Sequence, residues 1–249
     1  RVQLLTLLGQ CDFEAKRLAP SSANFEQALR LSETTAGALA LRPDILCRAA
    51  SVAAWQADAS RAIRLAEAAV EEATRLGQVE MQARAWLQLA TTLNQMDQQY
   101  RAEPTVDRAV ELAHRTGLVE YEARAWRLMS DVQNFRRHYA AALISARRSI
   151  AMWVRCGKVT MLIWARLMEL AILIESDQVE AAQAAAAALA THAGIQPAHV
   201  DSLQLLDALL DWKLGRTEAS FATLHELADR AASDINMNQM AAHAELAFM

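Results

Sequence analysis

Glycine and proline are scarce in this chain, with seven and four among 249 residues. All-β architectures use many residues of both types in their turns, so the scarcity excludes them and favours helices. Hydrophobic residues make up 53% and charged residues 22%, a composition typical of a folded chain and not of a disordered one. We therefore expect an all-α protein with an apolar core.

Cysteine is also rare, with three widely spaced residues and no Cys-x-x-Cys pair, which excludes a disulfide framework and fits a reducing compartment. No segment has the pattern of a signal peptide. The most apolar run, Val159 to Ile174, contains Arg166 and Glu169 and is shorter than the roughly 20 residues of a membrane span. We expect a cytoplasmic location without membrane contact.

An excess of basic residues is missing as well, because the net charge is −4. Nucleic-acid binders usually carry a basic face, so nucleic acid is disfavoured as a partner of this segment. Two short basic clusters, Arg136-Arg137-His138 and Arg147-Arg148, are the features that an RNA-binding alternative would use.

Motifs for chemistry are absent from the sequence. There is no Walker A loop, no GxGxxG, no GxSxG and no HExxH, and none of the six histidines has a His or Cys four residues away. We therefore expect no enzymatic activity, no cofactor and no metal, with the histidines at the surface or at helix ends. Glu169 lies in an apolar helix, where Arg166 is its expected partner.

The most informative feature is a 40-residue period. Four glycines keep this spacing, and the tetrapeptide Ala83-Arg84-Ala85-Trp86 recurs as Ala123-Arg124-Ala125-Trp126. A period of 20–50 residues indicates a solenoid or another repeat array. The four glycines are Gly37, Gly77, Gly117 and Gly157.

Each period contains two helices, because apolar residues recur with helical spacing on both sides of a short break. Glycine is expected just past the second helix, where a left-handed C-cap favours it. Pro43, Pro104 and Pro197 are expected in first turns, where the missing N–H does no harm. The expected helices span residues 1–18, 23–36, 44–57, 60–76, 80–95, 103–116, 120–135, 139–156, 159–175, 179–193, 198–213, 217–232 and 236–249.

The two best copies resemble the tetratricopeptide repeat (TPR). Its first helix carries a Trp-x2-Leu-Gly-x2-Tyr pattern, matched here by Trp86, Leu89 and the small Ala90, and then by Trp126, Met129 and the small Ser130. Leu93 and Gln133 replace the pattern's aromatic residue, and the period is longer than is usual for the family. The resemblance implies a right-handed α-solenoid, or superhelix, of about six antiparallel helix pairs forming one repeat domain over 1–249.

The longer period is similar to that of TPR segments in bacterial regulators, such as the sensor segment of MalT-type transcriptional activators. This resemblance implies a non-enzymatic interaction or sensor scaffold of a cytoplasmic regulatory protein. The alternative is a receptor domain for a small effector ligand, as in the MalT-type activators. Because the chain starts at Arg1 and stops at Met249, both within apolar segments, we expect it to be part of a longer protein.

In a TPR stack the first helix of each pair lines a concave groove. The outward rows of 80–95 and 120–135 should stand side by side and bring several arginines together, which suits an acidic peptide or protein partner because guanidinium groups bind carboxylates bidentately. Ordinary solvated Arg–Asp pairs, such as Arg127 with Asp131, are the competing interpretation. The expected groove residues are Arg84, Leu87, Thr91, Asn94, Arg124, Arg127, Asp131 and Asn134.

The helix at 159–175 is apolar almost all round, which is typical of burial between neighbouring helices. A homodimer through this helix, or through the apolar C-terminal helix at 236–249, is an alternative use of these surfaces.

Overall fold

The computed structural model describes residues 1–231 of the chain, in which helices are the only regular secondary structure. The all-α prediction is confirmed for this part, whereas the expected helix at 236–249 lies outside the described residues. The helices are α1 (Val2–Glu14), α2 (Leu18–Thr34), the short 3₁₀ helix η1 (Ala38–Leu41), α3 (Arg42–Trp55), α4 (Ala59–Arg75), α5 (Val79–Gln95), α6 (Gln99–Thr116), α7 (Val119–Phe135), α8 (Tyr139–Cys156), α9 (Val159–Glu175), α10 (Val179–Ala190), α11 (Pro197–Lys213) and α12 (Thr217–Ala231).

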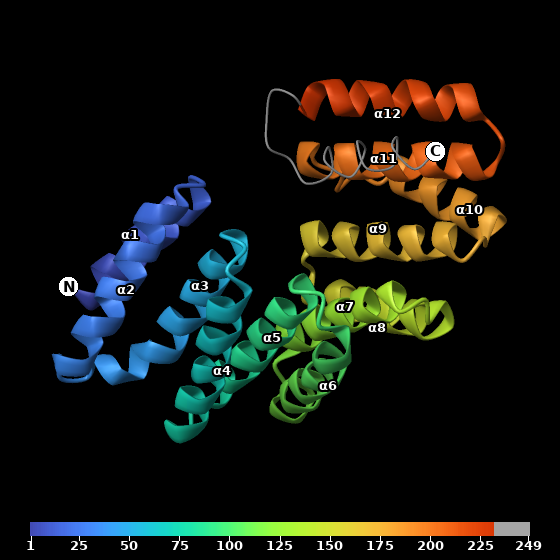
Figure 1. Ribbon diagram of the computed structural model, residues 1–249. Coiled ribbons are helices and arrows are strands. Elements are labelled where there is room, and N and C mark those ends of the chain that lie inside the picture. The colour runs from blue at the N-terminus through green and yellow to red at the C-terminus, as the bar shows by residue number, and fades with distance from the viewer. Residues whose placement is uncertain (232–249) are drawn as a thin grey trace. The chain divides into compact units, whose positions relative to one another are not determined.

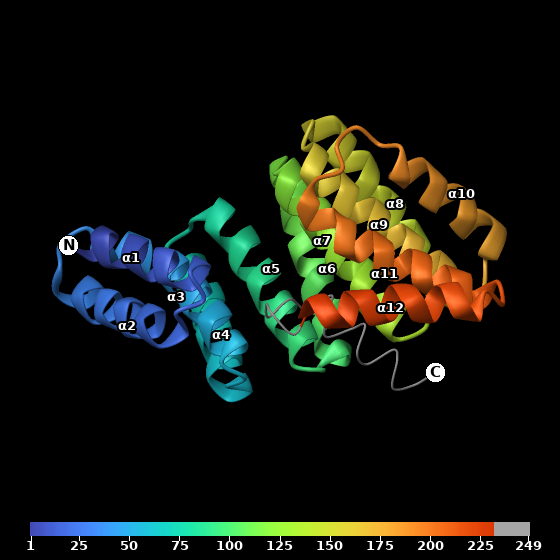
Figure 2. The ribbon, with the colours of Figure 1, turned by 90° about the horizontal axis from the view of Figure 1, so that it is seen from above.

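The helices fall into two compact units, the first of which is Arg1–Arg136. In this unit α1 packs on α2, α3 on α4 and α5 on α6, and the views in Figures 1 and 2 show these partners side by side. The first helices of successive pairs also pack together, since α5 contacts both α3 and α7. Stacking of helix pairs through their first helices is the arrangement that the 40-residue period predicts.

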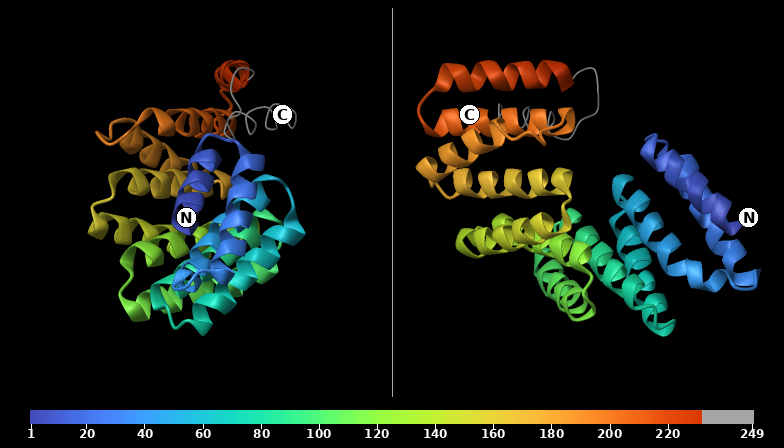
Figure 3. Two further views of the ribbon diagram at one scale, coloured as in Figure 1. Left: turned by 90° about the vertical axis from the view of Figure 1, so that its left-hand side faces the viewer. Right: turned by 180° about the vertical axis from the view of Figure 1, so that it is seen from behind.

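The second unit begins at Arg137, and its described part is 137–231. Here α9 contacts α8, α10 and α11, and α11 packs on α12. Figure 3 shows α9, α11 and α12 as successive layers. The contact between α9 and α11 repeats the rule of the first unit, because each is the first helix of its pair.

Small side chains let the helices of the first unit approach closely. Ala50, Ala90 and Ser130 occupy one repeat position on α3, α5 and α7, and all three are fully buried. The predicted small residues at Ala90 and Ser130 are therefore confirmed as buried. The larger Trp86 and Trp126 are partly buried and pack against the same core, as expected for residues of the repeat core.

Two sets of left-handed residues end the helices. The predicted glycines follow the second helix of each pair and have φ between 64° and 76°, at Gly37, Gly77, Gly117 and Gly157. A further set, which the sequence does not reveal, follows the first helices α3, α5, α7 and α9 and contains no glycine. These residues have φ between 55° and 60° and recur with the same period as the glycines, at Ala57, Asp97, Arg137 and Asp177.

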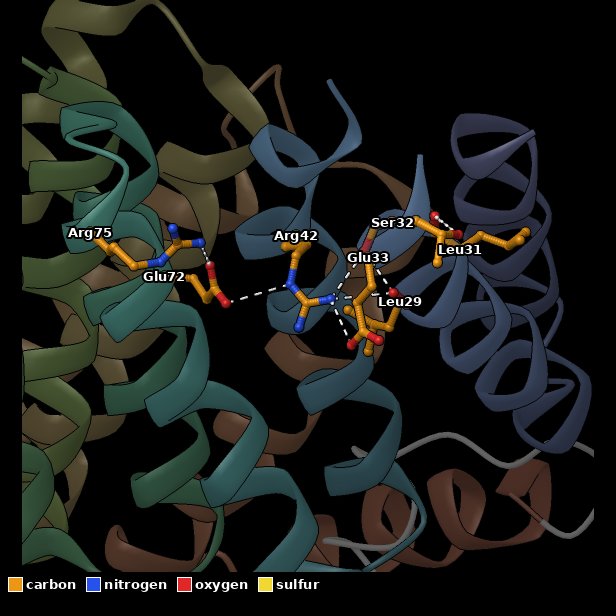
Figure 4. A network of polar contacts seen from close by, with 8 residues as sticks. Leu29, Leu31, Ser32, Glu33, Arg42, Glu72 and Arg75 are labelled. Atoms are coloured by element: carbon orange, nitrogen blue, oxygen red, sulfur yellow. Dashed lines mark hydrogen bonds and ion pairs between the residues drawn. The ribbon is translucent and has the colours of Figure 1, made fainter. Parts of the chain in front are cut away.

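A second repeat position ties α3 and α5 to the helices before them. Arg42, in the first turn of α3, donates to the Leu29 carbonyl and to Ser32 Oγ at 3.3 and 3.1 Å, and forms ion pairs with Glu33 and Glu72. Figure 4 shows its guanidinium between these two carboxylates of α2 and α4. At the same position of the next repeat, Gln82 Nε2 donates to the Ala73 carbonyl at 3.4 Å.

Three helix boundaries differ from the prediction by four residues or more. Pro104 lies inside α6, which begins at Gln99 and not at 103, so its expected place in a first turn is wrong. Burial of Ala102 and Val106 against the core stabilises α6 on both sides of this proline and outweighs the lost backbone hydrogen bond. Helix α2 starts at Leu18 with Pro20 in its first turn, and α1 ends at Glu14 because Lys16 adopts a left-handed conformation. Pro43 and Pro197 occupy first turns as predicted.

Candidate functional site

The candidate site lies along the first helices of the pairs in the first unit. One repeat position on α3, α5 and α7 is occupied by Asp44, Arg84 and Arg124. Asp44 accepts from Arg48 Nε at 2.8 Å and also forms an ion pair with Arg84. This carboxylate therefore neutralises the guanidinium of the next helix along the stack.

The next two arginines differ in whether a carboxylate holds them. Arg127 donates to Asp131 at 2.8 Å, one turn further along α7, as the solvated-pair interpretation predicts. Arg124 is exposed and has no carboxylate within ion-pair distance in the described part of the chain. Its donors are therefore available to a guest without breaking an ion pair.

Burial changes the pKa of Asp131, the acid that pairs with Arg127. It raises the pKa of Asp131, and the adjacent Arg127 guanidinium opposes this rise through its charge and its hydrogen bond. Asp131 Oδ2 receives that hydrogen bond, while Oδ1 is buried and receives none from residues 1–231. Asp131 is thus a support for Arg127 within the helix and not an exposed charge.

A pocket of about 270 Å³ opens between α5 and α7 around these arginines. Five of the eight predicted groove residues line it, and Asn94, Asp131 and Asn134 lie further along their helices and do not. Residues that sequence reasoning missed are Gln88, Tyr121 and Leu128. The lining is Arg84, Leu87, Gln88, Thr91, Tyr121, Arg124, Arg127 and Leu128.

A second pocket, of about 460 Å³, shares Tyr121 and Arg124 with the first, so the two adjoin at these residues. Its lining combines the turn before α7 with carboxylates from the starts of α5 and α7. Arg124 therefore stands where a basic stretch meets an acidic one. The lining is Glu80, Gly117, Leu118, Val119, Glu120, Tyr121 and Arg124.

A chain of hydrogen bonds fixes the floor of this face between α3 and α5. Ser51 Oγ donates to Gln88 Oε1 at 3.2 Å, and Gln88 Nε2 donates to Thr92 Oγ1 at 3.2 Å. Arg48 reaches α1 by donating to Gln10 Oε1 at 2.6 Å. Counting one repeat back from Arg84 and from Thr91 would have located Asp44 and Ser51 in the sequence.

Aromatic side chains mark the far end of the same helix face. Trp55 and Phe135 hold one repeat position, at the last residues of α3 and α7, and both are more than half exposed. Phe13 of α1 meets the Trp55 ring edge-on, with 6.1 Å between the ring centres. The face therefore changes from charged at the helix starts to aromatic at the helix ends.

In the second unit, Glu169 and His199 can be compared with what the sequence predicts. Glu169 accepts a hydrogen bond from Arg147 Nε of α8 at 2.8 Å, so the expected pairing with Arg166 is wrong. The partner comes from the neighbouring helix and not from α9 itself. His199 lies at a helix end as expected but is fully buried, and its Nδ1 accepts from the Gln196 backbone N–H at 3.0 Å. Dimerisation through α9 stays a prediction.

Membrane-spanning helices and clusters of metal-binding side chains are both absent from the described residues. No helix within 1–231 is both long and apolar enough to span a bilayer. Nowhere in that range do three His, Cys, Asp or Glu side chains gather in a way that could hold a metal ion.

Comparison with known proteins finds similarity in structure alone, because neither a family model nor a curated protein matches the chain. Aspartyl phosphate phosphatase F from Bacillus subtilis superposes with a TM-score of 0.78 and 14% identity, over 98% of this chain and 65% of that one.

Two further structures share the fold. The Rap conjugation gene regulator of the plasmid pLS20, in complex with the Phr* peptide, gives a TM-score of 0.70 and 14% identity over 92% of this chain and 63% of that one. PilF of Pseudomonas aeruginosa gives 0.63 and 13% over 98% and 97%. The chain therefore has a helical-repeat fold similar to that of these proteins, as its 40-residue period predicts.

Proposed function

We propose that this chain is a protein-interaction scaffold of a bacterial cytoplasmic regulatory protein, and that it binds a peptide or protein segment bearing a carboxylate. Binding would use the preformed face of α3, α5 and α7 and would involve no chemical step. The observation that carries the proposal is Arg124, an exposed guanidinium that no carboxylate of residues 1–231 pairs with, at the place where two pockets adjoin. A similar fold holds the Phr* peptide in the pLS20 regulator, which supports this use of the scaffold.

The charges along the face favour an acidic guest at one place. Asp44 already neutralises Arg84, and Asp131 already neutralises Arg127, so both retain only their remaining donors for a ligand. Arg124 lies beside both in the smaller pocket and can present a bidentate donor pair. A carboxylate placed there gains one charge-assisted contact and weaker support from its two neighbours.

The exposed aromatic rings give the guest a second kind of contact. Trp55 and Phe135 stand at the ends of α3 and α7, on the face that carries Arg124 nearer the helix starts. Large, partly exposed aromatic side chains are common energetic anchors in interfaces. We therefore expect a segment with one acidic residue and at least one apolar residue to bind better than a purely acidic one.

The test is fluorescence polarisation with a library of short labelled peptides containing Asp or Glu, matched by a library with Asn or Gln in their place. Acidic peptides should bind, and Arg124→Gln should weaken their binding about tenfold, the value of one lost charge-assisted contact. Arg64→Gln is the matched control, because Arg64 is exposed on α4, away from this face. Equal binding of both libraries, or equal effects of both substitutions, would contradict the proposal.

The second candidate is the small-ligand receptor domain of a MalT-like transcriptional activator, here with a small carboxylate as the expected ligand. The larger pocket, at about 460 Å³, has the size of a small-ligand site and offers Arg124 and Tyr121 as polar contacts beside the Glu80 and Glu120 carboxylates. A metabolite screen by thermal shift separates the two functions. A small carboxylate that raises the melting temperature of the native chain but not of Arg124→Gln would favour the receptor.

A further inference from the structure

A third pocket, of about 300 Å³, opens between α5 and α6 and shares no residue with the two pockets around Arg124. Trp86 and Leu112 are the partly buried apolar members of its lining, and the three charged side chains of the lining are exposed. The proposed peptide-binding face makes no use of this pocket. Its lining is Gln82, Trp86, Arg108, Glu111, Leu112 and Arg115.

The preceding helix pair, α3 and α4, carries an ion-pair network at the equivalent place. One 40-residue period before Gln82 and Leu112 stand Arg42 and Glu72. These two side chains pair at 3.5 Å, and Glu72 also accepts a hydrogen bond from Arg75 at 2.5 Å, as Figure 4 shows. The α3–α4 pair therefore holds a carboxylate of its own between two guanidinium groups.

The α5–α6 pair lacks this carboxylate, because Leu112 stands where α4 has Glu72. Within residues 1–231, Arg115 pairs with Glu111 instead, at 3.7 Å, which is too long for a hydrogen bond. Glu111 already accepts a hydrogen bond from Arg108 at 3.2 Å, so one carboxylate serves two guanidinium groups. The pocket therefore keeps one net positive charge, and a guest carboxylate can take the place that Glu72 has one period earlier.

Two further replacements make the α5–α6 pocket suitable for a flat guest. Trp86 stands where α3 has Leu46, and its partly buried ring packs against the core, so it offers a fixed aromatic surface. Arg108 stands where α4 has Ala68, and it lies two turns from Arg115 on the same face of α6. An apolar ring and an anionic group can therefore be held side by side.

We propose that this pocket binds a small aromatic carboxylate, with the ring against Trp86 and the carboxylate on Arg115 and Arg108. Guanidinium groups bind carboxylates through paired donors, and a volume of about 300 Å³ is at the lower end of the range for small-ligand sites. Binding involves no chemical step. The site is distinct from the face around Arg124 and does not depend on whether that face binds a peptide.

The probe is β-naphthoate, titrated into the full chain carrying fluorotryptophan and followed by fluorine NMR. Trp86→Phe identifies the Trp86 resonance, which should shift progressively as the probe is added. The neutral analogue β-naphthamide should bind about tenfold more weakly, because it cannot form the charge-assisted contacts. A Trp86 resonance that does not move, or equal binding of the two probes, would overturn the proposal.

Substitution of Leu112 tests whether the missing carboxylate creates the site. Leu112→Glu restores the α3–α4 pattern, so its carboxylate should occupy Arg115 and weaken β-naphthoate binding about tenfold or more. Leu112→Gln has the same size without the charge and should change the binding less than about threefold. Arg115→Gln should weaken binding about tenfold, whereas Arg124→Gln should leave it unchanged. Equal effects of the two Leu112 variants, or weaker binding by Arg124→Gln, would contradict the assignment of this pocket.

Discussion

Replacing Ala57 by glycine is expected to stabilise the first unit. Ala57 has φ 58°, a left-handed conformation that costs a residue with a Cβ about 1–2 kcal/mol relative to the right-handed one. Glycine removes this cost but loses about 0.5–1 kcal/mol through the greater freedom of its unfolded chain. The exposed methyl group contributes little packing. The free energy of unfolding should therefore rise by about 0.5–1 kcal/mol.

The reverse substitution, Gly77→Ala, is the matched control. Gly77 has φ 64°, and nothing lies within 4 Å of the place that a Cβ would take, so the change adds conformational strain and no clash. It should lower the free energy of unfolding by about 1 kcal/mol. Opposite signs at the turns that precede and follow α4 would be hard to obtain from any cause other than backbone conformation.

Urea unfolding of the full chain, followed by far-UV circular dichroism, measures both changes. A shift of about 0.7 kcal/mol moves the midpoint by about 0.3 M at a slope of about 2 kcal/mol per M, which is within the resolution of the method. Arg137→Gly, at φ 60°, should behave like Ala57→Gly and extends the test to the second unit. A lower midpoint for Ala57→Gly would refute the reasoning that these turns are strained.

Three further outcomes are expected. Arg42→Ala should lower the free energy of unfolding by about 2–3 kcal/mol in urea titration, because the mostly buried guanidinium donates to the Leu29 carbonyl and the Ser32 hydroxyl and pairs with Glu72. Arg42→Lys should recover less than half of this loss, because an ammonium group cannot reproduce the planar set of donors. Burial lowers the pKa of His199 from its ordinary 6.5, so its stabilising contribution is complete above pH 6.5 and declines as the pH falls below it. Urea titrations at pH 7.5 and 5.5 should show this loss, and His199→Gln should reduce it. Burial raises the pKa of Cys47 to about 12, so at pH 8 a thiol reagent should label exposed Cys11 rapidly and Cys47 only after denaturation.

Much of the candidate site follows from counting along the chain. The repeated tetrapeptide containing Arg84 and Arg124 shows that these residues stand at one position of adjacent first helices, and the structure brings them to one pocket. Counting one further period back from Arg84 would have located Asp44, the carboxylate at this repeat position. The count does not show that Asp44 reaches Arg84 while no carboxylate of residues 1–231 reaches Arg124, because that depends on distances between side chains of different helices.

The helix pairs, their period and the glycine turns can be predicted directly from the chain, because apolar periodicity and the tolerance of glycine for positive φ are local properties. The turns at Ala57 and Asp97 could not be predicted in this way, since both residues adopt the left-handed conformation with no compositional sign of it. Their conformation depends on tertiary packing, because the burial of both flanking helices against the core outweighs the local strain at the turn. The same balance explains Pro104 inside α6, where the buried face continues across a residue that would otherwise end a helix.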